Sequence, residues 1–191
     1  MDASGSLGAK KDLAFELSKR KFVKIRFSDM RKYSKTISER ILKTHGPPDV
    51  ILYAQRGGMV IARLLSDLLD VRDMACISAR YYSKSNKPFS KVMIGKIPKV
   101  DVDGYILLVD DIADSGKTLN AICEGLKKKS NVRVVTCTFG MKPQSVITPD
   151  FHAFTVNNDT WVIFEYEERE ALRNFSKTGN ASGLKFMKDN F

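Results

Sequence analysis

An uninterrupted apolar run that ends in two adjacent carboxylates constrains this chain more than any other feature. Tyr105 to Val109 has no polar alternation, which is typical of a strand buried on both faces of a parallel sheet. Asp110 and Asp111 follow where such a strand leaves the sheet, the edge at which open α/β sheets bind ligands. Two carboxylates there can accept hydrogen bonds from a vicinal diol and bind a hard cation. The run therefore predicts a parallel α/β sheet with a polar site at its edge.

The residues that follow favour a phosphate ligand. Asp114 to Thr118 lead into an apolar-periodic segment typical of a helix, so their backbone N–H groups are expected to point outward at its start. Gly116-Lys117-Thr118 also occurs in the phosphate loop of nucleotide triphosphatases, but that loop needs a glycine where this chain has Asp111. The spacing excludes that class and favours a sugar phosphate. A plain buried strand with a polar exit turn would not explain three Asp residues within five positions.

The stretch from Tyr105 to Thr118 resembles the phosphoribosyl pyrophosphate (PRPP) signature of the type I phosphoribosyltransferases. The resemblance implies an α/β fold with a central, mainly parallel sheet flanked by helices, a small hood subdomain and a mobile loop. It implies that Asp110 and Asp111 hold the ribose diol and Mg²⁺, and that Asp114 is the general acid or base near N7 of a purine. The residues expected at the 5′-phosphate are Asp114, Ser115, Gly116, Lys117 and Thr118.

A second anion-binding element, Gln55-Arg56-Gly57-Gly58, comes one β-α-β unit earlier. Two glycines permit close backbone approach to an anion, and Arg56 adds a permanently charged, planar donor. Such a segment alone is also an ordinary strand-to-helix turn. Its position before the PRPP signature resembles the pyrophosphate loop of purine phosphoribosyltransferases. The resemblance implies that Arg56 and Gly57 bind pyrophosphate and that the Gln55–Arg56 peptide is cis.

The third element joins Lys142-Pro143 to Asp159-Thr160-Trp161-Val162. A lysine can donate to an exocyclic oxygen, and an indole offers a flat face for stacking. Their order resembles the 6-oxopurine group of the family, closest to its xanthine-guanine type, and implies that Lys142, Trp161 and Val162 bind the base. That type continues with Pro-Trp-Asp where this chain has Glu165-Tyr166-Glu167. Glu167 is therefore expected to replace the Asp as a metal contact.

The resemblance implies a Mg²⁺-dependent enzyme of purine salvage that transfers the phosphoribosyl group of PRPP to guanine, xanthine or hypoxanthine. Lys142 argues against adenine, whose 6-amino group is itself a donor. Two alternatives stay open: a different acceptor within the fold, such as a pyrimidine, and, from another class, a regulator of the same fold that senses PRPP or a nucleotide and binds nucleic acid. Family habit predicts a homodimer or tetramer.

Charge is concentrated near the N-terminus. Residues 9–43 carry twelve Lys or Arg against four Asp or Glu, which accounts for +8 of the net charge of +10. Such a field attracts nucleic acid or steers a polyanionic substrate to its site. No zinc-finger spacing or aromatic-rich basic module accompanies it, so we expect a polyanionic substrate rather than nucleic acid. The absence of long apolar runs predicts no membrane partner and a cytoplasmic protein. The three cysteines are expected to be reduced core residues.

The alternation of elements predicts one domain over residues 9–167, after a disordered stretch at 1–8. A Lys-rich loop at 81–104, with a frayed hairpin, is expected to act as a lid. The extension at 168–191 is polar with scattered Phe, and its role is unassigned. The predicted strands lie at 22–27, 49–55, 74–82, 132–139, near 151–156 and at 161–164. The predicted helices lie at 9–20, from an N-cap at Ser28 to near Gly46, and at 58–70.

Overall fold

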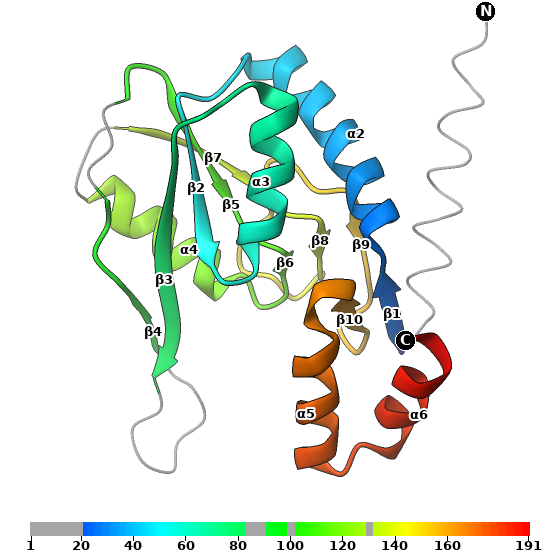
Figure 1. Cartoon of the computed structure of the whole chain (residues 1–191). Helices are drawn as coiled ribbons and strands as arrows, with labels where there is room; N and C mark the ends of the chain where they lie inside the picture. The colour runs from blue at the N-terminus through cyan, green and yellow to red at the C-terminus, as the bar shows by residue number, and fades with distance from the viewer. Residues whose placement is uncertain (1–20, 83–90, 99–101, 129–131) are drawn as a thin grey trace, which may run out of the picture. The chain divides into compact units, whose positions relative to one another are not determined.

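The computed structural model describes residues 21–82, 91–98, 102–128 and 132–191 (Figure 1). The predicted helix at 9–20, the predicted disorder at 1–8 and part of the predicted lid lie outside these residues. The chain divides into two compact units. Among the described residues, one unit comprises 31–155, and the other comprises 21–30 together with 156–191.

The larger unit is built on a five-stranded sheet in the order β4-β3-β2-β5-β7. Its strands are β2 (Val50–Gln55), β3 (Met74–Tyr82), β4 (Lys91–Ile94), β5 (Tyr105–Val109) and β7 (Arg133–Cys137). All pairings are parallel except β3 with β4, which is antiparallel and corresponds to the predicted hairpin. Every residue of β5 is buried, as expected for a central strand covered on both faces.

Two helices cover this sheet. α3 (Gly58–Leu69) connects β2 to β3, and α4 (Lys117–Lys127) follows β5 and leads to β7. The two crossovers run outward from the centre in opposite directions, so their usual right-handedness puts the helices on opposite faces. α4 packs on the face that includes Ile106 and Leu108, while Leu107 on the other face is equally buried. The strand order therefore reverses between β2 and β5, the kind of point at which α/β sheets bind ligands.

A second, small sheet extends the larger unit. It consists of β6 (Ile112–Ala113), β8 (Gly140–Met141) and β9 (Phe154–Thr155), all parallel. α2 (Phe27–His45) contributes Tyr33, whose ring contacts Phe139 and Phe154 at centroid distances of 5.8 and 5.4 Å. β9 lies within the strand predicted near 151–156, but β6 and β8 are too short to leave a periodic pattern, so the sequence did not predict this sheet.

The smaller unit contains a two-stranded parallel sheet and the C-terminal extension. β1 (Phe22–Ile25) pairs with β10 (Trp161–Phe164), and a short 3₁₀ helix η1 (Glu165–Glu167) follows. The extension forms two helices, α5 (Glu168–Thr178) and α6 (Ala181–Asn190), which pack on each other. α5 also contacts β10 and α6 contacts β1.

The start of α2 differs from the expectation of a Ser28 cap. The helix begins at Phe27, and the Asp29 carboxylate accepts a 3.0 Å hydrogen bond from the Arg26 N–H, as an acidic third residue does in a capping box. Glu165 accepts the Phe27 N–H at 2.8 Å. A carboxylate in place of the proline seen in the xanthine-guanine type thus caps α2.

The cysteines are all reduced, but only two of them are core residues. Burial raises the pKa of Cys123 to about 11 and that of Cys137 to about 12. Cys76 is exposed, so its expected place in the core was wrong. Within the described part of the chain, no helix is long and apolar enough to cross a membrane.

Candidate active site

Two turns meet at the switch point between β2 and β5. Tyr53 pairs with Val109, so the residues that follow both strands emerge at the same edge. Gly57 lies so close to Asp111 that a Cβ would overlap the Asp111 carboxylate. A Cβ on Gly58 would overlap the Val109 carbonyl oxygen. The two glycines are therefore required by the close approach of the turn after β2 to the end of β5.

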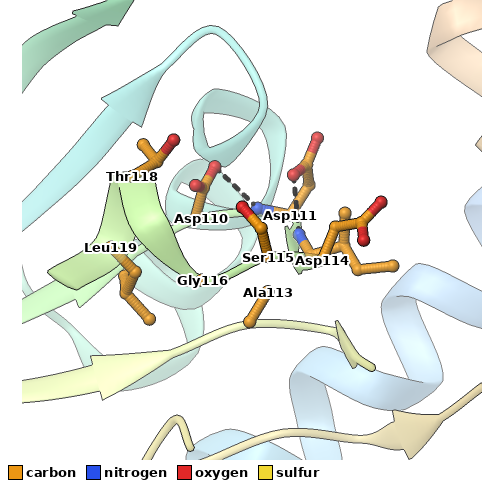
Figure 2. Close-up of a pocket in the computed structure, with 9 residues that line it drawn as sticks. Asp110, Asp111, Ala113, Asp114, Ser115, Gly116, Thr118 and Leu119 are labelled. Atoms are coloured by element: carbon orange, nitrogen blue, oxygen red, sulfur yellow. Dashed lines mark hydrogen bonds between the residues drawn. The ribbon is translucent and has the colours of Figure 1, made fainter. Parts of the chain in front are cut away.

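The paired carboxylates are held by the backbone next to them. Asp110 accepts the Asp111 N–H at 3.0 Å, and Asp111 accepts the Ile112 N–H at 2.6 Å (Figure 2). They open onto a pocket of about 210 Å³. Its lining residues are Asp110, Asp111, Ile112, Ala113, Asp114, Ser115, Gly116, Thr118 and Leu119. The structure thus brings together every residue predicted at the diol and the 5′-phosphate except Lys117, whose side chain is exposed.

Gly116 shapes the phosphate turn. It caps α4 with a φ of 68°, in the left-handed region, and supplies no side chain to the first-turn N–H groups. A Cβ at this position would overlap the Ser145 hydroxyl and would lie 3.1 Å from the Val146 nitrogen. The Val146 N–H also donates to the Ser115 carbonyl at 3.0 Å. The turn is therefore held from behind by residues 145–146, and the N-terminus of α4 remains a site suited to an anion.

The small sheet brings Lys142 to Asp114. Ala113 pairs with Met141, and the Lys142 N–H donates to the Ala113 carbonyl at 3.0 Å, so the next two residues face each other. The Lys142 ammonium donates to Asp114 Oδ2 at 2.8 Å. Lys142 is only 7% exposed, and a buried ammonium requires a partner of this kind.

Gln144 also binds Asp114 and was not predicted. Its Nε2 lies 2.5 Å from Asp114 Oδ1, so the two carboxylate oxygens have different partners. The Ser145 N–H donates to the Lys142 carbonyl at 3.0 Å, which closes a β-turn with Pro143 at its second position. A Lys-Pro dipeptide after a strand signals such a turn, but nothing in the sequence indicated that the turn would return to Asp114.

Arg56 lies at a second opening beside the end of β2. A pocket of about 310 Å³ is lined by Gln55, Arg56, Ser78 and Ala79. The Gln55–Arg56 peptide is cis, as the resemblance implied. Ser78 and Ala79 belong to β3, and no motif in the sequence connects that strand with this site. The arrangement presents a guanidinium beside the turn that Gly57 brings to Asp111.

The remaining predicted residues belong to the smaller unit. Trp161 and Val162 begin β10, and the Trp161 N–H donates to the Lys21 carbonyl at 2.8 Å. Glu167 Oε2 accepts the Phe164 N–H at 3.4 Å and caps η1. The side chain expected to contact a metal therefore also stabilises the local backbone.

The donors at the switch point suit Mg²⁺. This ion typically binds one or two carboxylates together with substrate phosphates, rather than a full set of protein ligands. Asp110 and Asp111 supply such a pair. Among the residues that the structure describes, no group of three or more His, Cys, Asp or Glu side chains is arranged to hold a metal. This donor set fits a metal that arrives with its phosphate substrate.

Comparisons with known proteins identify the family of this chain. Residues 25–170 match the family described as "Phosphoribosyl transferase domain". The xanthine-guanine phosphoribosyltransferase of Gluconobacter oxydans is 26% identical over 147 residues, which cover 76% of this chain and 84% of that protein. The enzyme of the same name from Ruegeria sp. is 33% identical over 132 residues, covering 64% of this chain and 72% of the relative.

A solved structure is similar as well. The xanthine-guanine-hypoxanthine phosphoribosyltransferase of Helicobacter pylori superposes with a TM-score of 0.69 at 25% identity, covering 82% of this chain and 99% of that one. These relatives bear the names of enzymes, and the regulatory alternative gains no support from them. The chain belongs to the type I phosphoribosyltransferases, in their 6-oxopurine group.

Proposed function

We propose that this protein transfers the 5-phosphoribosyl group of PRPP to N9 of a 6-oxopurine, giving a nucleoside 5′-monophosphate and pyrophosphate in purine salvage. Family membership supports the reaction, and the arrangement of Lys142 and Asp114 supports the class of acceptor. The proposal extends to Mg²⁺ dependence, a homo-oligomeric state and a cytoplasmic location.

The observation that carries the proposal is the Lys142–Asp114 pair. Its nitrogen and oxygen lie 2.8 Å apart, so a donor and an acceptor stand side by side. A 6-oxopurine in its N7–H form has the complementary groups on one edge, an acceptor at O6 and a donor at N7. An ammonium has three donors, so Lys142 can bind O6 while still holding Asp114. Adenine would put its 6-amino donor against the same ammonium, which disfavours it.

The switch point supplies the sites for PRPP. Backbone N–H groups and hydroxyls of residues 114–118 would bind the 5′-phosphate, and Asp110 and Asp111 would hold the ribose diol and Mg²⁺. Arg56 and Gly57 would bind the pyrophosphate, and Glu167 would add a metal contact. When bound, Mg²⁺ would neutralise charge on the departing pyrophosphate. Trp161 and Val162 would contact the base, a role that rests on the resemblance alone.

The reaction needs no protein nucleophile. The bond from C1′ to the pyrophosphate oxygen breaks, and pyrophosphate leaves with the electron pair. N9 of the purine then bonds to C1′, and the N7 proton passes to the Asp114 carboxylate. Positive charge develops at C1′ as the bond breaks, and the nearby carboxylates of Asp110 and Asp111 stabilise it.

The test is a nucleotide-formation assay with PRPP and Mg²⁺, following the absorbance change of guanine, xanthine, hypoxanthine or adenine. We expect turnover with at least one of the three 6-oxopurines and none with adenine. Lys142→Ala should raise the KM for the base and leave the KM for PRPP unchanged. Inactivity with all four bases would contradict the proposed reaction, and preference for adenine would contradict the role of Lys142.

A further inference from the structure

The C-terminal extension surrounds the one tryptophan of the chain with an aromatic cluster. The indole ring of Trp161 lies 5.0 Å from the ring of Phe175 in α5, with 64° between the planes. Trp161 is 41% exposed, whereas Phe175 is completely buried. One side of the indole is thus supported by a fixed ring while apolar surface remains accessible, and edge-to-face pairs of this kind favour one orientation.

Phe175 is itself fixed from two further directions. Phe22 of β1 contacts it edge-on at 5.6 Å. Gly183 of α6 approaches it so closely that a Cβ at that position would lie 2.7 Å from the Phe175 ring. The Asn180 side chain accepts the Gly183 N–H at 2.9 Å and caps α6 where this contact begins. The ring therefore has little freedom to move away from Trp161.

The end of the chain is anchored to the same sheet. Lys24 of β1 donates to the Asn190 carbonyl at 2.5 Å, and its ammonium lies 3.7 Å from the centre of the Phe191 ring. α6 is thus attached to β1 at its C-terminal end, and α5 packs on β10 (Figure 1). Phe175, Gly183 and Phe191 all lie beyond residue 170, where the family match ends.

We propose that the C-terminal helix pair orients the indole on which the purine base stacks, with Phe175 as its positioning residue. The inference rests on the proposed function for the role of Trp161. Stacking requires the indole plane to be held parallel to the base, and a freely rotating side chain would lose part of that binding in ordering the ring. The extension is thereby part of base recognition and acts through Trp161 without touching the substrate.

The test compares Phe175→Leu with Phe186→Leu. Phe186 stacks on Phe22 at 5.4 Å, so it belongs to the same aromatic cluster and provides a matched loss of one ring. Phe175→Leu should raise the KM for the base about three- to tenfold, the factor that one aromatic pair contributes. Its kcat at saturating base and its KM for PRPP should stay within about twofold of the wild type, and Phe186→Leu should leave the base KM unchanged.

Fluorescence gives a second measurement that does not require turnover, because Trp161 is the single tryptophan. Titration with a 6-oxopurine nucleoside monophosphate should quench the wild type, and Phe175→Leu should need about three- to tenfold more ligand for the same quench. If Phe175→Leu is unstable by circular dichroism, Phe175→Met replaces it. Equal shifts in the Phe175 and Phe186 variants, or no quench in the wild type, would overturn the inference. Quenching without any turnover would overturn the proposed reaction alone.

Discussion

The two compact units hold their predicted site residues in place by different means. In the larger unit, strand register and glycines place the polar groups: Gly57 and Gly116 stand where a Cβ has no room. In the smaller unit, side-chain packing from a C-terminal helix places Trp161. A Cβ at Gly57 or Gly116 would overlap neighbouring atoms, whereas the loss of one ring contact removes only part of the packing around Trp161. We therefore expect abrupt losses from substitutions in the first region and graded losses in the second.

The largest effect is expected from Asp114→Asn. The amide oxygen can still accept a hydrogen bond from Lys142, but it cannot take the N7 proton. The kcat should fall about 10²- to 10⁴-fold, the usual contribution of a general acid or base. Steady-state kinetics with guanine or hypoxanthine measures it. Asp103→Asn, which neutralises an exposed carboxylate before β5, is the control and should be silent. Unchanged turnover in the Asp114 variant would remove this residue from the mechanism.

Gly57→Ala tests whether the close approach of the two turns is required. The added methyl group would overlap the Asp111 carboxylate, so either the loop or this carboxylate, the proposed Mg²⁺ ligand, must move. A displacement of about 1 Å can cost about 10²-fold in rate, and we expect a loss of kcat/KM of that order.

The control for this glycine is Gly46→Ala. Gly46 has a positive φ of 73°, unlike Gly57, whose φ is −54°, but a Cβ at Gly46 would meet nothing within 4 Å. Its substitution should cost about 1–2 kcal/mol of unfolding free energy and leave the activity of the folded enzyme intact. If both variants lost activity equally, general destabilisation would explain the result, and the contact with Asp111 would not.

The sequence predicted the larger unit well because its site follows from local rules. A buried strand, two carboxylates and a glycine at a helix start need no knowledge of distant partners, and the structure gathers these residues around one pocket. The strand near 151–156 was predicted and contains β9, but the small sheet was missed because β6 and β8 form only through long-range pairing. That pairing also brings Gln144 and Lys142 to Asp114, so the sequence did not indicate these two contacts either.

The extension was unassigned because its apolar residues are few. Ala171 and Phe175 occur four residues apart, and Gly179-Asn180 marks a helix end followed by a helix start, which is a genuine but weak signal. The sequence alone does not show which residues pack against Ala171 and Phe175. Phe175 contacts Trp161 of β10, and this contact forms only when the chain folds.

The smallest effect is expected from Gln144→Ala, which tests whether a side-chain contact in the larger unit also gives only a graded loss of activity. Gln144 supports Asp114 through its side chain, whereas the rest of the site in this unit is shaped by the backbone. We therefore expect its removal to cause only a partial loss of activity. Asp114 keeps its Lys142 partner and is exposed, and one hydrogen bond contributes about 0.5–1.5 kcal/mol, which predicts a loss of kcat/KM of about two- to tenfold.

Val146→Ala, one residue after the same turn, is the control for Gln144→Ala. The Val146 side chain is exposed, and the variant keeps the backbone bond to Ser115, so its kinetics should match the wild type. A loss in Gln144→Ala as large as that in Asp114→Asn would mean that the carboxylate works only when both of its oxygens are held. A large loss of activity would then follow from breaking a side-chain hydrogen-bond network as well as from adding a Cβ at a glycine. The two units would differ less than we propose.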